Sequence, residues 1–191
     1  MKSLNHNWEE FYKNNKVSNL PSNFCLFFLT KRIRGESIID IGCGNGRDTL
    51  YIEKMGGYKK IIGIDMAINK DSISEQNIDF IKDDFNNRYD LIRKSDIVYS
   101  RFFIHSISNK EIIELIKNTN GYFCAEARAK GDKPGIYKDH NRNFIDEEWI
   151  KNKLVELGFN ILYEEVGRGM AIYKNENPLI IRIIAKKNIK I

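Results

Sequence analysis

Residues 40–48, Asp40-Ile41-Gly42-Cys43-Gly44-Asn45-Gly46-Arg47-Asp48, decide the fold that this sequence predicts. The three glycines end an apolar run that starts at Ser37, and an amphipathic segment, Asp48–Met55, follows them. A short apolar run bounded by turn residues indicates a buried strand, and the segment after the glycines indicates a helix. Glycines at this junction permit a tight turn and close approach of a ligand, because side chains there would collide with it. The stretch therefore predicts a strand, a ligand-binding loop and a helix.

The same alternation continues along the chain. Strands are predicted over Ser37–Gly42, Lys60–Asp65, Ile78–Ile81, Asp96–Ser100, Gly121–Ala127, Phe159–Val166 and Leu179–Ala185. Helices are predicted over Trp8–Tyr12, from Pro21-Ser22 to Lys31, and over Asp48–Met55, Asn109–Lys117 and Glu147–Leu157, with a short, poorly patterned helix within Met66–Gln76. Strands that alternate with helices predict an α/β fold with a mostly parallel, doubly wound, Rossmann-like seven-stranded sheet. Helices should cover both faces, and the last two strands should form an antiparallel hairpin at one edge.

Composition excludes several classes of protein. With 191 residues, 42% of them hydrophobic and 30% charged, the chain suits one globular domain and excludes a disordered or collagen-like one. Three cysteines without a CxxC pair predict neither a disulfide framework nor a zinc site. No basic-then-apolar start and no long apolar run is present, so we expect a cytoplasmic protein that does not enter a membrane.

The net charge of +5 raises the question of nucleic acid. Binding to a phosphate backbone needs a concentrated basic patch, whereas these lysines are scattered along the whole chain. The charge therefore indicates a solvated lysine-rich surface, and no nucleic-acid partner is expected.

The spacing of the glycines distinguishes between kinds of ligand-binding loop. A dinucleotide loop would need its third glycine at position 47, and a nucleotide-triphosphate loop would need a Gly-Lys-Ser/Thr ending; neither is present. Asp40-x-Gly42-x-Gly44-x-Gly46 instead resembles the first motif of class I S-adenosylmethionine-dependent methyltransferases. The resemblance implies that Asp40 contacts the amino group of the methionine moiety, and that the loop, Cys43 and Asn45 included, admits methionine and ribose. The alternative is a simple glycine turn between strand and helix.

Later segments resemble further parts of the same family. Asp65 closes the next strand, where the family's second acid binds both ribose hydroxyls, with Met66 beside it; a helix cap is the alternative. Lys82-Asp83-Asp84-Phe85 resembles the adenine-binding turn, in which Asp83 or, preferably, Asp84 accepts from the amine and Phe85 packs on the ring; a solvated turn is the alternative. Ser100 and Arg101 end the fourth strand, where family members build the floor under the methionine moiety.

Two features of the sequence are candidates for binding or activating the methyl acceptor. His105 follows the fourth strand and is a candidate general base for a hydroxyl proton; a structural histidine is the equal alternative. Cationic side chains after the fifth strand and near the chain's end are candidates for a clamp on a phosphate or carboxylate. These are Arg128, His140, Arg142 and Arg168, together with Arg101. The alternative is a surface loop held by ion pairs with Glu126 and Asp132.

The sequence thus predicts an S-adenosylmethionine-dependent methyltransferase, yielding S-adenosylhomocysteine, that acts on a small polar, anionic acceptor without a metal. Residues 1–34 would form a helical cover, with Trp8, Phe11 and Tyr12 as a lid or as core, and residues 35–191 the catalytic sheet of a monomer or homodimer. The segments Tyr99–Ile107, Gly167–Pro178 and Ile180–Lys187 also resemble small bacterial methyltransferases of surface-polysaccharide modification, which favours a sugar or phosphorylated metabolite as acceptor. A tRNA or rRNA methyltransferase and a noncatalytic S-adenosylmethionine-binding protein are the alternatives.

Overall fold

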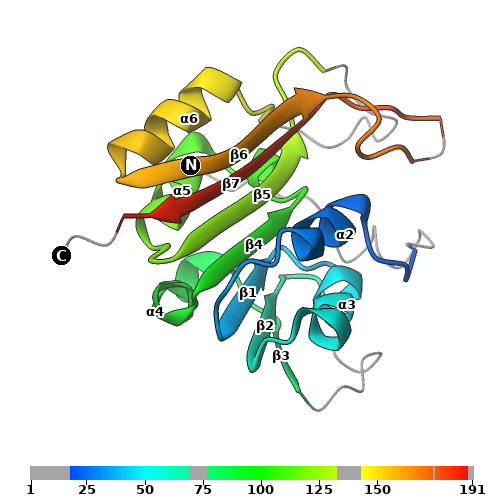
Figure 1. Cartoon of the computed structure of the whole chain (residues 1–191), viewed down its shortest axis with the longest axis vertical. Helices are drawn as coiled ribbons and strands as arrows, with labels where there is room; N and C mark the ends of the chain where they lie inside the picture. The colour runs from blue at the N-terminus through cyan, green and yellow to red at the C-terminus, as the bar shows by residue number, and fades with distance from the viewer. Residues whose placement is uncertain (1–17, 69–76, 133–142, 174, 189–191) are drawn as a thin grey trace.

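The structure, a computed structural model, describes residues 18–68, 77–132, 143–173 and 175–188. Its centre is a seven-stranded sheet with strand order β3-β2-β1-β4-β5-β7-β6, in which β7 alone runs against the other strands (Figure 1). The strands are β1 (Ser37–Ile41), β2 (Lys60–Ile64), β3 (Ile78–Ile81), β4 (Ile97–Arg101), β5 (Tyr122–Arg128), β6 (Phe159–Gly167) and β7 (Ile180–Lys187). The Rossmann-like fold class and the C-terminal antiparallel hairpin are confirmed.

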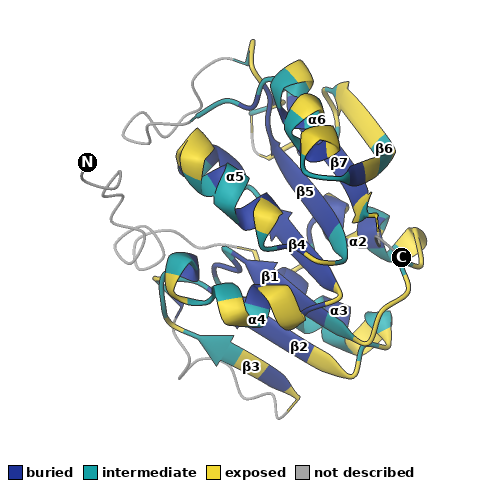
Figure 2. Cartoon of the chain, turned by 90° about the vertical axis from the view of Figure 1, so that its left-hand side faces the viewer, coloured by how far each residue is buried: buried dark blue, intermediate teal, exposed yellow. Residues whose placement is uncertain are grey.

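Helices cover both faces of the sheet. They are α2 (Asn23–Thr30), α3 (Arg47–Gly56), α4 (Tyr89–Lys94), α5 (Asn109–Lys117) and α6 (Glu147–Glu156), with the short 3₁₀ turns η2 (Phe85–Asn87) and η3 (Ile104–Ser106). Helices α2 and α3 lie on one face, and α4, α5 and α6 lie on the other (Figures 1 and 2). Strands β1, β2 and β4 are therefore buried on both sides, which explains their continuous apolar runs.

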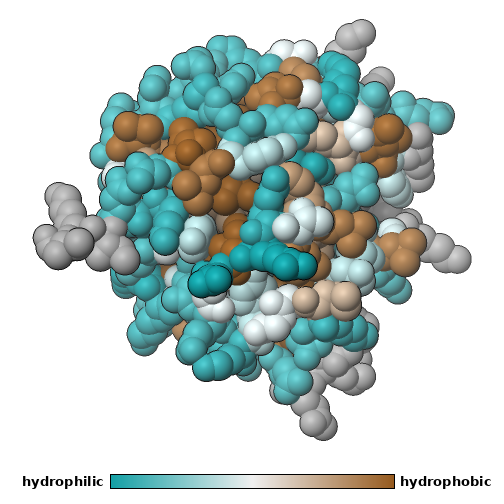
Figure 3. Space-filling view, in the orientation of Figure 1, coloured by the Kyte–Doolittle hydropathy of each residue, from teal (hydrophilic) through white to brown (hydrophobic). Residues whose placement is uncertain are grey.

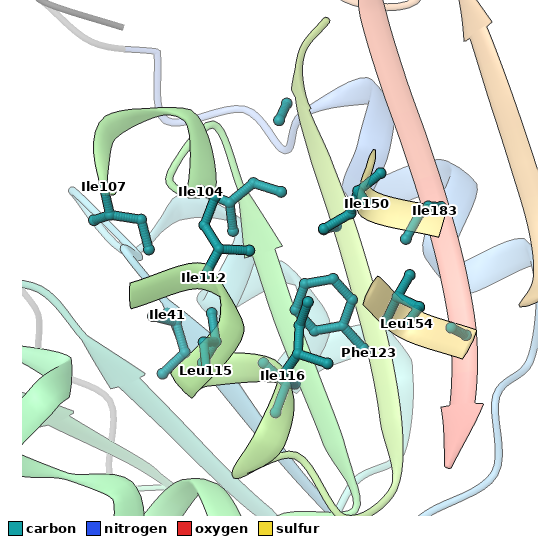
Figure 4. Close-up of a cluster of buried hydrophobic side chains, with 14 of the residues drawn as sticks. Ile41, Ile104, Ile107, Ile112, Leu115, Ile116, Phe123, Ile150, Leu154 and Ile183 are labelled. Carbon is teal, nitrogen blue, oxygen red and sulfur yellow. The ribbon is translucent and has the colours of Figure 1, made fainter. Parts of the chain in front are cut away.

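Each face has its own hydrophobic core. Under α5 and α6, side chains such as Ile112, Leu115 and Leu154 pack against Phe123 and Ile183 of the sheet (Figure 4). Under α2 and α3, three rings gather: Phe24 stacks on Tyr99 with centroids 5.1 Å apart, and Phe28 meets Tyr99 edge-on at 5.2 Å. This second core fixes α2 beside the carboxyl end of β4.

The predicted helices agree with the structure to within one residue at most ends, because their caps are encoded locally. Ser108 and Glu111 form a reciprocal capping box at the start of α5, and Asp146 accepts from the N–H of Trp149 at the start of α6. Helix α4 was not predicted, since six residues are too few to display a helical period.

Two expectations fall largely outside the described residues: the helix over Trp8–Tyr12 and most of the segment Met66–Gln76. Within the part of the chain that the structure covers, no helix is long and apolar enough to cross a membrane.

Candidate cofactor and acceptor site

The glycine loop joins the carboxyl end of β1 to α3 in a conformation that requires glycine. Gly42, Gly44 and Gly46 have φ angles of +75°, +60° and +76°, a region that residues with a Cβ rarely adopt. A Cβ on Gly42 would also lie 2.5 Å from the ring of Phe103, which covers the loop from the β4 side. Gly46 begins α3 without any side-chain cap. The first backbone N–H groups of the helix therefore have no side-chain partner at the N-cap.

Asp65, directly after β2, holds the loop in place. Its Oδ2 accepts from the N–H of Gly44 at 2.8 Å, and its Oδ1 accepts from the N–H of Ala67 at the same distance. Burial raises the pKa of this carboxyl group, an effect that the two N–H donors oppose. Each oxygen still has a lone pair to offer, so the geometry suits a vicinal diol. Met66 beside it is largely exposed.

Asp40, at the middle of the sheet, is a buried carboxyl group that accepts one hydrogen bond from the described part of the chain. Thr49 Oγ1 donates to Asp40 Oδ2 at 2.6 Å. Burial raises the pKa of Asp40 to about 8; the Thr49 hydrogen bond opposes this rise, and the negative charges of Asp48 and Asp65 add smaller contributions to it. A cationic group placed beside this carboxyl would favour its ionised form. The site is therefore suited to an ammonium ligand.

Asp48 is a buried carboxylate beside the site that the sequence analysis did not single out. Its Oδ1 accepts from the Ser22 N–H at 2.7 Å, and its Oδ2 accepts from Ser22 Oγ at 2.6 Å and from the Tyr99 hydroxyl at 2.8 Å. Ser22 is also the N-cap of α2. One carboxylate thus ties α2, α3 and β4 together. A second tie runs from Asn45 Nδ2 to the carbonyl oxygen of Ser18 at 3.3 Å.

The turn after β3 separates the two adenine candidates. Asp83 accepts from Asn87 Nδ2 and from Arg88 Nε and Nη2 at 2.9, 2.7 and 2.6 Å, so both its oxygens are engaged. These hydrogen bonds, that of Asn87 foremost, lower the pKa of Asp83. Asp84 caps η2 through Oδ1 alone. The geometry thus favours Asp84 over Asp83 as the adenine acceptor, and that contact stays a prediction.

An aromatic pair links this turn to the glycine loop. Phe85 is buried and meets Phe103 edge-on, with ring centroids 5.2 Å apart. Since Phe103 also lies against Gly42, the two rings connect the proposed adenine and methionine ends of the site. Cys43, beside Gly42, is buried, which raises the pKa of its thiol.

His105 lies buried in η3 with its ring in a defined position. Its Nδ1 accepts from the N–H of Arg128 at 3.1 Å, and its carbonyl oxygen accepts from the N–H of Asn143 at 2.7 Å. An accepting Nδ1 places the proton of the neutral ring on Nε2. This arrangement favours the structural alternative for His105, and its role as general base stays a prediction.

Arg128, at the end of β5, and Arg168, directly after β6, are paired with acids. Arg128 donates from Nη1 to Asp132 at 2.9 Å and from Nη2 to Glu176 at 2.6 Å. Arg168 donates to the other oxygen of Asp132 at 3.2 Å. Two cations and two carboxylates balance, which favours the ion-paired loop over a cationic clamp at these positions. His140 and Arg142 lie outside the described residues.

A different cationic group lies at the carboxyl end of β4, on the α2 side of the sheet. Arg101 Nε donates to Glu126 Oε1 at 3.2 Å, and Arg182 Nε donates to Glu126 Oε2 at 2.8 Å. Arg182 was not among the predicted residues, because it lies far along the chain on β7. Ser100, one residue before Arg101, is fully buried and donates from its hydroxyl to the carbonyl oxygen of Ile41 at 3.3 Å.

No group of three or more histidine, cysteine, aspartate or glutamate side chains is arranged for a metal ion among the described residues. A surface depression of about 380 Å³ exists, but Gly35, Met55, Gly56 and Tyr58 among its lining residues place it at the opposite edge of the sheet. Ligands of doubly wound sheets bind beyond the carboxyl ends of the strands. The depression is therefore separate from the candidate site.

Comparison with known families adds independent information. Residues 14–164 match the family described as "Methyltransferase domain". Over 79 residues the chain is 37% identical to "Putative methyltransferase 235L" of Invertebrate iridescent virus 6. That match covers 40% of this chain and 29% of the viral protein, so the chain spans less than a third of this relative.

Solved structures share the fold at low sequence identity. A SAM-dependent methyltransferase from Anabaena variabilis superposes with a TM-score of 0.71 at 16% identity and 98% coverage of both chains. A SAM-dependent methyltransferase from Archaeoglobus fulgidus gives 0.66 at 18% identity, covering 95% of this chain and all of its own. Magnesium protoporphyrin IX methyltransferase from Synechocystis, crystallised with bound SAM, gives 0.61 at 16% identity, with 86% and 76% coverage.

Proposed function

Because the chain belongs to the methyltransferase-domain family, in which S-adenosylmethionine is the methyl donor, we propose that it is an enzyme that methylates a small polar acceptor. The observation that carries the proposal is the pairing of the glycine loop with Asp65. Three glycines at positive φ end β1, and the N–H of the middle one donates to the acid that ends β2. Such a loop and acid bind an adenosyl ligand at the carboxyl edge of a parallel sheet.

The residues present fit the donor. Asp65 offers two carboxylate oxygens to the ribose hydroxyls, and Asp40 offers a buried carboxyl group to the ammonium group of the methionine moiety. Asp84 and Phe85 supply an acceptor and an apolar surface for adenine. The loop between them follows a path that requires glycine, with positive φ angles at Gly42, Gly44 and Gly46.

The donor supplies an activated methyl group on a sulfonium, which transfers to a nucleophile by in-line displacement. The chain's own task is therefore to align the acceptor and to exclude water. Helix α2, tied down by Asp48, covers the site on one face, and Phe103 covers the glycine loop. A base for the acceptor's proton is required only if a hydroxyl is methylated. We propose His105 for that role.

The acceptor is proposed as a small sugar or phosphorylated metabolite, methylated on oxygen in surface-polysaccharide biosynthesis. This rests on the resemblance of the segments quoted above and on the cationic side chains of the site. We also propose that the protein is cytoplasmic and that it is a monomer or a homodimer.

Calorimetry with S-adenosylmethionine, followed by incubation with methyl-labelled donor and separate pools of small sugars, sugar phosphates and tRNA, tests the proposal. We expect binding of the donor and label transfer to a small molecule. Label in tRNA, with binding that weakens steeply as salt rises, would establish the RNA alternative. Donor binding without transfer to any pool would indicate a noncatalytic binding protein, and no donor binding would overturn the enzyme.

A further inference from the structure

Three charged side chains form a row across adjacent strands on the α2 face of the sheet. In the register of the sheet Arg101 of β4 is opposite Glu126 of β5, and Glu126 is opposite Arg182 of β7. Each arginine donates from Nε to a different oxygen of Glu126. Cross-strand neighbours of opposite charge stabilise each other. We name Arg101, Glu126 and Arg182 the charge row.

Burial differs along the charge row. The side chain of Glu126 is 1% exposed and that of Arg182 is 8% exposed, whereas that of Arg101 is 20% exposed. Arg182 is further fixed by the Met170 carbonyl oxygen, which accepts from its Nη2 at 3.1 Å, and by the ring of Phe27, 4.9 Å from its guanidinium carbon. Glu126 and Arg182 are thus buried and held in place, and Arg101 is the most exposed residue of the charge row.

Arg101 presents unused hydrogen-bond donors. Its Nε is engaged by Glu126, and its guanidinium carbon lies 4.3 Å from the centre of the Phe102 ring. Neither Nη1 nor Nη2 donates to any residue in the described ranges of the chain. Neither nitrogen is among the buried polar atoms that lack a hydrogen-bond partner. A guanidinium fixed at Nε and by stacking directs its two remaining nitrogens as a fork, which matches the two oxygens of an acidic group.

The charge balance favours an anion here. Two arginines and one glutamate leave the charge row with one net positive charge, whereas the Arg128–Asp132–Glu176–Arg168 cluster balances. Asp40, on the neighbouring strand, adds little negative charge near neutral pH because burial raises its pKa. The negative charge of Asp48 has its own partner, since Nε of Arg47 lies 3.9 Å from Asp48 Oδ1. The charge row thus keeps one positive charge.

We propose, building on the proposed function, that Arg101 binds an acidic group of the methyl acceptor, a carboxylate or a phosphate, and that Glu126 and Arg182 position it. The surroundings suit such an acceptor, since the α2 face shows strongly hydrophilic side chains amid hydrophobic ones (Figure 3). Exposed hydrophobic side chains lie before and on α2 and between β6 and β7, namely Leu20, Leu26, Ile172 and Tyr173. An acceptor with an acidic group and an apolar or stacked portion would contact both kinds of side chain.

The test uses three probes of nearly equal size: glucose, glucuronate and glucose 6-phosphate. Their dissociation constants are measured by calorimetry on the full chain, with and without S-adenosylhomocysteine. For the wild type we expect at least one acidic probe to bind about tenfold or more tightly than glucose. Whether glucuronate or glucose 6-phosphate binds more tightly identifies the acidic group as carboxylate or phosphate.

Variants then assign the preference to the charge row. Arg101→Met should abolish the preference for acidic probes while S-adenosylmethionine affinity stays within about threefold. Arg182→Gln, which leaves Glu126 with one arginine and the row neutral, should reduce the preference without changing donor affinity. Arg93→Met, on the opposite side of the molecule in α4, is the matched control and should change neither quantity. Thermal unfolding checks that each variant is folded.

Each other outcome has a defined meaning. A wild type without preference for either acidic probe overturns the proposal. So does an Arg101→Met variant that keeps the preference, or one that loses donor affinity instead, since Arg101 would then bind the methionine carboxylate. A wild type that prefers acidic probes but does not bind S-adenosylmethionine would leave the acidic subsite standing and overturn the proposed function.

Discussion

Replacing Asp48 by alanine should detach α2 from the rest of the site. The substitution removes the acceptor of three hydrogen bonds, two from Ser22 and one from the hydroxyl of Tyr99. Tyr99 is fully buried and Ser22 is nearly so. The Ser22 hydroxyl can rotate to another partner, but the Ser22 N–H and the Tyr99 hydroxyl cannot both do so without moving α2.

The expected cost follows from those two donors. A buried donor left without a partner costs about 1–3 kcal/mol, so the variant should lose about 4 kcal/mol of unfolding free energy. For a domain of this size that corresponds to a fall in Tm of about 8–16 °C. Urea unfolding followed by circular dichroism, together with calorimetric melting, measures both quantities.

Asp48→Asn is the matched control. Its amide oxygen can accept from the Ser22 N–H while its amide nitrogen donates to the two hydroxyl oxygens, which can reorient. We expect a loss under about 1.5 kcal/mol, since every buried group keeps a partner. In the Asp48→Ala background, Tyr99→Phe should recover about half of the lost stability, because it removes the unpaired hydroxyl but leaves the Ser22 N–H without its acceptor. Equal losses for Asp48→Ala and Asp48→Asn would refute the reasoning.

Four further outcomes are expected. Asp65→Asn should weaken S-adenosylmethionine binding by about 5- to 150-fold, because the amide pairs poorly with the Gly44 N–H and the ribose; calorimetry showing unchanged affinity would place the ribose elsewhere. Gly42→Ala should destabilise the fold and lower donor affinity, since the new methyl group meets Phe103 at positive φ; a normal melting curve would contradict this. Folded Asp40, with a pKa of about 8, keeps a proton that the unfolded group releases near 3.8, so wild-type stability should fall between these pH values. The fall should be at most about 1.4 kcal/mol per pH unit and should be absent in Asp40→Asn, so equal slopes in urea titrations at several pH values would exclude it. EDTA should leave turnover unchanged, and a loss of turnover would reveal a metal requirement.

The sequence predicted the sheet well because its signals are local. Runs such as Ile61-Ile62-Gly63-Ile64 are buried on both faces, so consecutive positions carry the same apolar signal. Helix ends could be predicted equally well where the capping residues lie within three positions of each other, as at Ser108. The short α4 and the two 3₁₀ turns escaped prediction, since fewer than two helical turns show no period.

For the candidate site, too, contacts between residues close in sequence were easier to predict than contacts between distant ones. The motif predicted Asp65 as a ligand of the ribose hydroxyls, which stays a prediction, and the structure adds a contact that the motif did not indicate, from the N–H of Gly44 to Asp65 Oδ2 at 2.8 Å. The ion pair of Arg128 with the nearby Asp132 was one of the two alternatives, whereas its second partner, Glu176, lies 48 positions along the chain and was not anticipated. Asp48 looked like an ordinary first-turn residue, since its partners Ser22 and Tyr99 are likewise brought in by tertiary packing. Sequence spacing cannot reveal neutralisation by distant residues.

The position of β7 has a consequence for synthesis of the protein. This strand follows all the others along the chain, yet it lies between β5 and β6 and pairs with both. Until its residues leave the ribosome, β5 and β6 each keep an open edge, a state in which strands join unintended partners. Arg182 also arrives only with β7, so the nascent chain carries a buried acid, Glu126, that lacks its second cation. The inner edge of the sheet and the charge row are therefore completed in one step, when β7 pairs with β5 and β6.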